Sequence, residues 1–174
     1  MGKRSNFERV ERDFYPTPKA AADVLIRHMS KDNHIYVEPC VGKWDLFNHL
    51  TEARFHCWYA SDINPASEFD VSIDALTIDE QYCGRADYII TNPPWTRSIL
   101  HPMIEHFRKL RPTWLLIDAN WMFTKQAKPY LKYCKEIVNI GRVKWIPDSK
   151  YTGKDDCCWY LFDKQETETI FIND

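Results

Sequence analysis

Apolar segments with strand character alternate with amphipathic helical segments along most of this 174-residue chain. The clearest strand signal is TWLLIDA, 113–119, whose nearly continuous apolar run is typical of a strand buried on both faces. Because such alternation is typical of strands connected by helices that pack on them, it predicts a mostly parallel sheet with helices on both faces. The fold class is therefore α/β.

The expected elements follow one another in a regular order. A helix is predicted from Pro18 to about Ser30, with Thr17 as its N-cap and proline at its first position. Two further helices are predicted at 42–53 and 98–110, and strands at 34–40, 55–62, 88–92 and 113–119. The segments 135–147 and 156–164 are joined by a short polar stretch containing Gly153, which predicts an antiparallel pair at the C-terminal edge of the sheet.

Size, charge and cysteine usage limit the class of protein. One domain is expected over 1–174, with 1–13 as a flexible lead-in. The net charge of -2 and pI of about 6.3 exclude a polycation, so a nucleic acid would be bound by local basic patches. Six scattered cysteines without a CxxC pair predict reduced, mostly buried thiols and no metal site. With no apolar run of about 20 residues and no signal peptide, we expect no membrane contact and a cytoplasmic location.

The loops that follow the strands are the candidate functional segments, because ligands of open α/β sheets bind beyond the carboxyl ends of the strands. In EPCVG, 38–42, Gly42 permits close backbone approach, although a simple β-to-α turn is the favoured interpretation of this segment taken by itself. Asp62 follows about 20 residues later, the separation at which an acidic residue meets ribose hydroxyls, with a helix cap as the alternative. Asp74 in IDAL is a weaker signal of the same kind.

The stretch YIITNPPW, 88–95, ends a predicted strand with an amide, two prolines and a large ring. Pro93 and Pro94 fix the backbone, so that Asn92 and neighbouring carbonyls present acceptors in one direction. Two converging acceptors suit an amino group with two protons, such as the exocyclic amine of adenine or cytosine. Hydrogen bonds from both protons favour a nitrogen whose lone pair is free to react. Trp95 would stack on the ring, whereas the alternative is a cis-proline turn with a core tryptophan.

Together these motifs resemble the S-adenosylmethionine-dependent amino-methyltransferases, in particular the DNA N6-adenine methyltransferases. The resemblance extends from about Phe14 to Asp163 through short motifs. It implies a class I methyltransferase, Rossmann-like fold and S-adenosylmethionine as the cofactor. It also identifies the NPPW tip as the catalytic motif, formed by Asn92, Pro93, Pro94 and Trp95.

The same resemblance implies a cofactor site built from several motifs. FYPTP is similar to the family's entry segment and EPCVG to its methionine-binding loop. Asp62 would bind the ribose, Ile63 would lie against the adenine, and Asp74 would meet the adenine amino group. The full set of implied cofactor residues is Tyr15, Thr17, Pro18, Glu38, Pro39, Cys40, Gly42, Asp62, Ile63, Asp74, Ala75 and Asn92.

A substrate surface is expected around GRVKWIP, 141–147, which resembles the family segment whose aromatic residue packs on the flipped base. Trp145 would be a second stacking face opposite Trp95, so that two tryptophans sandwich one base, although a buried strand position explains it almost equally well. Arg142 and Lys144 would contact phosphates. The basic residues that follow the tip, Arg97 among them, are more often a solvated helix face.

Two departures from the family pattern bear on function. Trp44 occupies the second glycine position of the usual G-x-G loop, where a bulky ring would crowd the cofactor, and its replacement by glycine is expected to tighten binding. The chain also leaves no room for a recognition domain, as in small forms found in phage genomes. Sequence specificity would then be low or supplied by a protein partner.

The resulting prediction is methyl transfer to an exocyclic amine, with adenine N6 in DNA favoured. Nucleic acid, DNA before RNA, is the expected partner, in the host cytoplasm if the protein is phage-encoded. Methylation of RNA adenine or of a protein glutamine remains open. So do a nucleic-acid-binding module of the same fold without turnover and a subunit that needs a partner.

Overall fold

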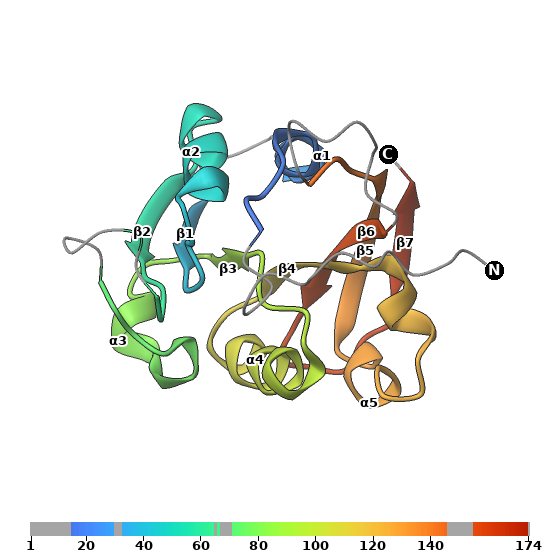
Figure 1. The fold of residues 1–174 in the computed structure, drawn as a ribbon. Helices are drawn as coiled ribbons and strands as arrows, with labels where there is room; N and C mark the ends of the chain where they lie inside the picture. Colours follow the sequence, from blue (N-terminus) through green and yellow to red (C-terminus); the bar gives the residue numbers. More distant parts are fainter. Residues whose placement is uncertain (1–14, 30–32, 65, 67–70, 146–154, 174) are drawn as a thin grey trace.

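The computed structural model describes residues 15–29, 33–64, 66, 71–145 and 155–173 (Figure 1). Its centre is one seven-stranded sheet with the order β2-β1-β3-β4-β6-β5-β7. The strands are β1 Ile35–Glu38, β2 His56–Ala60, β3 Tyr88–Thr91, β4 Thr113–Asp118, β5 Cys134–Arg142, β6 Asp156–Phe162 and β7 Ile170–Asn173.

Only β6 runs against the other described strands. The pairs β1–β2, β1–β3, β3–β4 and β5–β7 are parallel, whereas β6 pairs antiparallel with both β4 and β5. The predicted antiparallel pair is therefore confirmed, with β6 inserted between β4 and β5. β7, at the outer edge, was not predicted, and the expected turn at Gly153 lies outside the described residues.

Helices cover both faces of the sheet (Figure 1), so the α/β fold class is confirmed. One face carries α1 Lys19–Met29 and α2 Asp45–Glu52. The other carries α4 Arg97–Leu110 together with shorter elements, which are η2 Ala75–Thr77, α3 Glu80–Cys83, η3 Ala119–Phe123 and α5 Lys128–Leu131.

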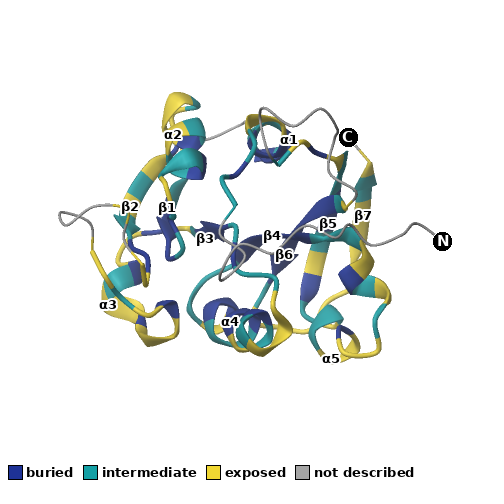
Figure 2. Ribbon diagram, in the orientation of Figure 1, coloured by how far each residue is buried: buried dark blue, intermediate teal, exposed yellow. Residues whose placement is uncertain are grey.

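Two hydrophobic clusters, one on each face, hold the layers together. Trp114 packs in the cluster beneath α1 and α2, and its neighbour Leu115 packs in the cluster beneath α4. Successive residues of a strand point to opposite faces, so β4 must be apolar at nearly every position to fill both clusters. Figure 2 shows the result, with buried residues concentrated in the central strands. This burial accounts for the apolar run of 113–117.

The start of α1 differs from the prediction by one residue. The carbonyl of Pro18 accepts hydrogen bonds from the backbone N–H groups of Ala21 and Ala22, at 2.9 and 3.3 Å, and the helix begins at Lys19. Pro18 is therefore at the N-cap position, and the prediction of Thr17 as N-cap is wrong. The Thr17 hydroxyl instead accepts a hydrogen bond from Asn92, which ties the entry segment to the NPPW tip.

The six cysteines are all described, and all are free thiols, four of them buried. Burial raises the pKa of Cys134 to about 12 and that of Cys158 to about 11, so these thiols stay protonated at neutral pH. Among the described residues, no helix is long and apolar enough to cross a bilayer.

Candidate active site

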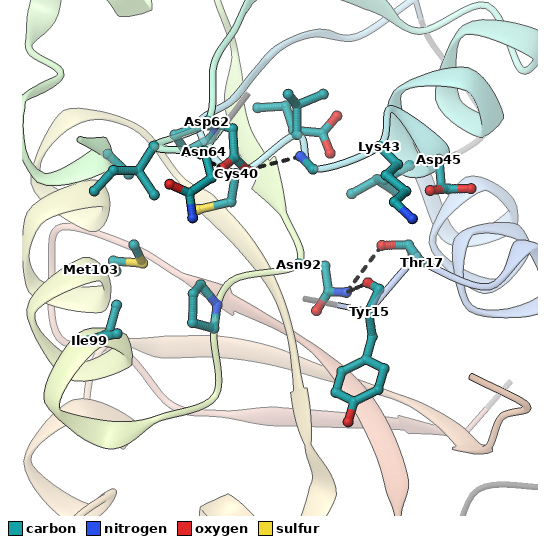
Figure 3. Close-up of a pocket in the computed structure, with 18 of the residues that line it drawn as sticks. Tyr15, Thr17, Cys40, Lys43, Asp45, Asp62, Asn64, Asn92, Ile99 and Met103 are labelled. Carbon is teal, nitrogen blue, oxygen red and sulfur yellow. Dashed lines mark hydrogen bonds between the residues drawn. The ribbon is translucent and has the colours of Figure 1, made fainter. Parts of the chain in front are cut away.

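The chain order of the sheet reverses at β1, which places a crevice at its carboxyl end. From β1 the chain continues to β2 on one side, and β3 lies on the other side. The loops after β1 and β3 therefore diverge, which is the arrangement that forms ligand sites in open α/β sheets. A cavity of about 560 Å³ lies there (Figure 3), a size typical of small-molecule sites.

The cavity gathers nearly all the residues predicted to bind the cofactor. Pro18 is the exception, because it turns into α1 while its neighbour Pro16 lines the cavity. The predicted residues found in the lining are Tyr15, Thr17, Glu38, Pro39, Cys40, Gly42, Asp62, Ile63, Asp74, Ala75 and Asn92. They come from five segments that are far apart in the sequence.

Glu38, the last residue of β1, contributes a buried carboxyl group to the cavity. Glu38 is only 1% exposed, and the Oε2 atom of its side chain has no hydrogen-bond partner among the described residues. Burial, and then the charges of Asp62 and Asp45, raise the pKa of Glu38 well above its ordinary value. A carboxyl group in this position favours a ligand that brings a positive charge or a hydrogen-bond donor.

Asp62 connects two of the loops that line the cavity. Its Oδ2 accepts a hydrogen bond from the Gly42 N–H at 3.0 Å, and its Oδ1 accepts one from the Asn64 N–H at 2.8 Å. The residue thus stabilises a turn and not a helix, which sets aside the helix-cap alternative. Each carboxylate oxygen can accept a second hydrogen bond, so the side chain can also bind a ligand hydroxyl.

Asp74 combines a structural contact with a place in the cavity lining. Its Oδ1 accepts a hydrogen bond from the Leu76 N–H at 2.9 Å and caps η2. Ala75, which follows it, is buried at 4% exposure. The second oxygen of Asp74 remains as an acceptor at the cavity edge.

The NPPW tip presents the Asn92 amide in a defined orientation. Its Nδ2 donates to Thr17 Oγ1 at 3.2 Å and to the Tyr15 carbonyl at 3.5 Å (Figure 3). Both amide protons are therefore used, and among the described residues Oδ1 has no partner. The peptide bonds of the tip are trans, so it is not the cis-proline turn of the alternative interpretation. Asn92 is left with one acceptor that can meet a ligand.

Trp95 and Trp145 contact each other beside the tip. Their ring centroids are 5.4 Å apart with an interplanar angle of 86°, and Trp95 Nε1 donates to the Leu116 carbonyl at 2.9 Å. Trp145 also meets Tyr15 edge to face at 6.4 Å. Because the two indoles are nearly perpendicular, the predicted parallel sandwich for a base is not preformed. A base would have to displace Trp145 or stack on another face of Trp95.

Arg142 and Lys144 lie outside the cavity lining. Both are exposed, and Arg142 Nε is 3.4 Å from Asp156 Oδ1 on β6. A paired arginine is a weaker phosphate ligand than an unpaired one, since the carboxylate competes for it. Arg142 and Lys144 are therefore not part of the cavity that contains Asn92.

Several cavity residues were missed by the sequence reasoning. Ile99 and Met103 line the cavity from the first turns of α4 (Figure 3), and their spacing of four residues places them on one helix face. That spacing, directly after the tip, was an available signal. Lys43 and Asp45 also line the cavity, although neither was among the predicted cofactor residues.

Trp44 does not crowd the cavity, which overturns the expected effect of its ring. It has φ 68° and ψ 12°, in the left-handed region, and occupies the N-cap position of α2. Its ring packs edge to face on Phe47 with centroids 4.9 Å apart, and it is not part of the cavity lining. The backbone thus keeps the conformation that a glycine would favour, while the side chain points elsewhere.

We therefore expect Trp44→Gly to leave ligand affinity within about twofold of wild type, as for substitutions away from a site. Trp44→Ala is the matched variant, since it also removes the ring but keeps a side chain at positive φ. The glycine variant should be more stable than the alanine variant by about 1 kcal/mol, because only alanine is strained there. Calorimetric titration and urea unfolding measure both quantities, and a tenfold gain in affinity for Trp44→Gly would restore the crowding hypothesis.

Comparison with solved structures identifies the fold. A protein of Pyrococcus horikoshii described as an RNA methyltransferase superposes with a TM-score of 0.63 at 14% identity, over 87% of this chain and 86% of its own. The methyltransferase subunit of a type I restriction-modification system from Streptococcus thermophilus gives 0.57 at 11%, over 92% of this chain and 47% of its own. The 23S rRNA methyltransferase ErmE gives 0.53 at 10%, over 88% and 71%.

Comparison of the sequence with known families and proteins identifies no family for this chain. No protein-family model matches the chain, and no curated protein matches it. The chain spans about half the length of the type I subunit. At these identities the likeness concerns the fold, and the protein has the mostly parallel α/β fold of the class I methyltransferases.

Proposed function

We propose that this protein is an S-adenosylmethionine-dependent methyltransferase that modifies the exocyclic amine of a nucleobase, adenine N6 in DNA. The observation that carries the proposal is the orientation of Asn92. Its Nδ2 is engaged by Thr17 and Tyr15, so the acceptor Oδ1 is left at the edge of the cavity. An acceptor is what an amine substrate requires.

The cavity residues fit S-adenosylmethionine. The cofactor carries an ammonium group and a sulfonium, and four carboxyl groups line the cavity, those of Glu38, Asp45, Asp62 and Asp74. The unpartnered Oε2 of Glu38 suits the ammonium group, and Asp62 suits the ribose hydroxyls. When bound, the cofactor supplies a methyl group made electrophilic by the sulfonium.

The tip residues activate the amine by hydrogen bonding. Asn92 Oδ1 and the Pro93 carbonyl accept the two N–H groups, which favours a tetrahedral nitrogen with its lone pair free. As positive charge develops on that nitrogen, the same two acceptors stabilise it until one proton leaves to water. Trp95, anchored through Nε1 to the Leu116 carbonyl, offers a fixed ring on which the base stacks.

An extrahelical or unpaired base fits this arrangement better than a paired one, because the amine must reach an acceptor at a cavity edge. The same contacts would serve adenine in RNA, and two of the structural neighbours are described as RNA methyltransferases. The tip alone would also accept a glutamine amide. DNA is proposed on the likeness of the motif set to the DNA adenine enzymes.

The test is transfer of a labelled methyl group to a matched set of oligonucleotides. Single-stranded and duplex DNA and RNA are incubated with methyl-labelled S-adenosylmethionine, digested, and their nucleosides identified by mass spectrometry. We expect N6-methyladenine in DNA. A DNA in which every adenine is replaced by purine, which lacks the amine, should gain no label. Label only on RNA or only on cytosine would redirect the assignment, and no label on any of these substrates would contradict it.

A further inference from the structure

Phe123, the last residue of η3, is unusually exposed. Its side chain is 81% exposed, the highest value among the large exposed apolar residues in the described part of the chain. It follows β4, whose carboxyl end lies at the same edge of the sheet as the NPPW tip, because β3 and β4 are parallel neighbours. An apolar ring is thus displayed on the side of the molecule that carries the cavity.

The exposure of Phe123 does not reflect a loosely held loop. Trp121, two residues earlier, is buried at 4% exposure, and its Nε1 donates to His101 Nε2 on α4 at 3.1 Å. Thr124 Oγ1 donates to the Trp121 carbonyl at 2.8 Å, and Asp118 Oδ1 accepts from the Asn120 N–H at 2.8 Å. The segment is fixed on both sides of Phe123, so the ring stands on a rigid support.

Arg97 connects this support to the active site. Its guanidinium donates to the Gln126 side chain, which joins the start of α4 to the segment between η3 and α5. The next residue, Ser98, lines the cavity. Thr91, the last residue of β3, pairs with Leu115 of β4, and β4 continues for three more residues to Asp118. At about 3.3 Å per residue, β4 therefore extends about 10 Å beyond the end of β3. The η3 segment that carries Phe123 therefore begins beyond the end of β3, at the edge of the sheet where Asn92 lies.

The charge around Phe123 is positive. Arg97, Lys125 and Lys128 are exposed, and none of them pairs with a carboxylate among the residues that the structure describes. The segment 119–131 contains no aspartate or glutamate. This local excess contrasts with the net charge of -2 for the whole chain. It also contrasts with Arg142, which is paired with Asp156.

We propose that Arg97, Phe123, Lys125 and Lys128, here called the Phe123 platform, bind the nucleic acid strand next to the target base. The Phe123 ring stacks on an unpaired base, and the three cations contact the phosphates on either side of it. This inference rests on the proposed function for its substrate class. It assigns the strand contact to the η3–α5 side of the cavity and not to the Arg142 side.

The composition of the platform favours a nucleic acid over a protein partner. Single-strand sites combine cations that follow the backbone with aromatic rings that stack on bases, and every base offers a face for stacking. A protein interface of usual size would need more apolar surface than one ring. A rigid ring also loses little conformational entropy when it binds, which suits a weak contact of low sequence specificity.

The platform is tested by binding of a fluorescein-labelled single-stranded DNA of 12 nucleotides, followed by fluorescence anisotropy. Phe123→Ala should weaken binding about 5- to 150-fold, the range of one base–aromatic stack, and Phe123→Trp should restore it. Phe171→Ala on β7 is the matched control, since Phe171 is also exposed, at 57%, but lies on the outer edge strand. It should bind as wild type does.

Salt dependence separates the ring from the cations. Lys125→Ala with Lys128→Ala should reduce the slope of log affinity against log salt by about 1.4, because each phosphate that a lysine neutralises on a single strand accounts for about 0.7. Phe123→Ala should weaken binding without changing that slope. If the double lysine variant keeps the wild-type slope, the cations of the platform do not contact phosphates.

The outcomes for the platform and for the proposed activity can be told apart. Cofactor binding and methyl transfer are measured on the same proteins. A wild type that transfers methyl groups while Phe123→Ala binds DNA normally would overturn the platform and leave the activity intact. Loss of binding in Phe123→Ala, in a protein without transfer, would support the platform and contradict the activity. A wild type that binds no nucleic acid overturns the platform.

Discussion

Replacement of Asn92 by alanine is expected to lower methyl transfer by at least about 10²- to 10³-fold, the usual cost of removing one hydrogen-bonding group aimed at the transition state. The substrate amine loses the acceptor Oδ1, which no described residue engages. Cofactor affinity should fall only severalfold, because Asn92 reaches the cofactor side through its bonds to Thr17 and Tyr15. Single-turnover transfer and calorimetric titration with S-adenosylmethionine measure the two effects separately.

Two variants separate the acceptor from the structural contacts of Asn92. Thr17→Val removes the hydroxyl that accepts from Nδ2 but leaves Oδ1 in place, so transfer should fall only severalfold. Asn92→Asp keeps an acceptor oxygen and should retain more activity than Asn92→Ala. If Thr17→Val loses as much transfer as Asn92→Ala, the amide acts by holding the entry segment, and the proposed contact with the amine is wrong.

The sequence predicted the sheet well because β4 and its neighbours have patterns that few other folds produce. Burial on both faces requires an apolar residue at nearly every position of 113–117, and that pattern is visible without a structure. β7 was not predicted because its four residues are mostly exposed, so burial imposes no alternation of apolar and polar residues on them. η3 escaped because a short 3-10 segment has no periodicity to detect.

The place of the cavity was predictable because three of its lining segments follow β1, β2 and β3, and the parallel topology brings such loops together. Side-chain direction was not predictable. Trp44 has a left-handed backbone conformation that favours glycine, yet its ring packs on Phe47, and only the structure shows this. The perpendicular contact of Trp95 with Trp145 has the same origin, since a motif gives residue types but not interplanar angles.

Glu38→Gln is expected to stabilise the protein without cofactor while weakening its binding of S-adenosylmethionine. Burial, then Asp62 and Asp45, raise the pKa of Glu38 in the folded state, so the folded protein holds its proton more tightly than the unfolded chain. Wild-type stability therefore falls as pH rises from about 4.5, the ordinary pKa, to the raised folded value. Glutamine does not titrate, so the variant should match wild type below that window and exceed it in melting temperature above.

Glu38→Gln should lower the affinity for S-adenosylmethionine, whereas it should raise the stability of the protein without cofactor. The cofactor's ammonium group would lose its carboxylate partner in Glu38→Gln, and a hydrogen bond to a charged group is worth about 1.5–3 kcal/mol, or roughly 10- to 150-fold in affinity. Wild-type affinity should rise with pH across the same window, because binding favours the ionised carboxyl and releases its proton. Titration in buffers of different ionisation enthalpy counts that proton.

Asp45→Asn is the matched control for Glu38, since it removes a negative charge from the same cavity but leaves the buried carboxyl in place. It should shift the pH window of Glu38 downward, because one of the charges that raise the Glu38 pKa is gone. Its effect on affinity should be smaller than that of Glu38→Gln, since the direct partner of the ammonium group remains. Equal losses in the two variants would mean that the cavity attracts the cofactor by its total charge. Glu38 would then be a structural residue with an unfavourable carboxyl group and not the anchor of the methionine end.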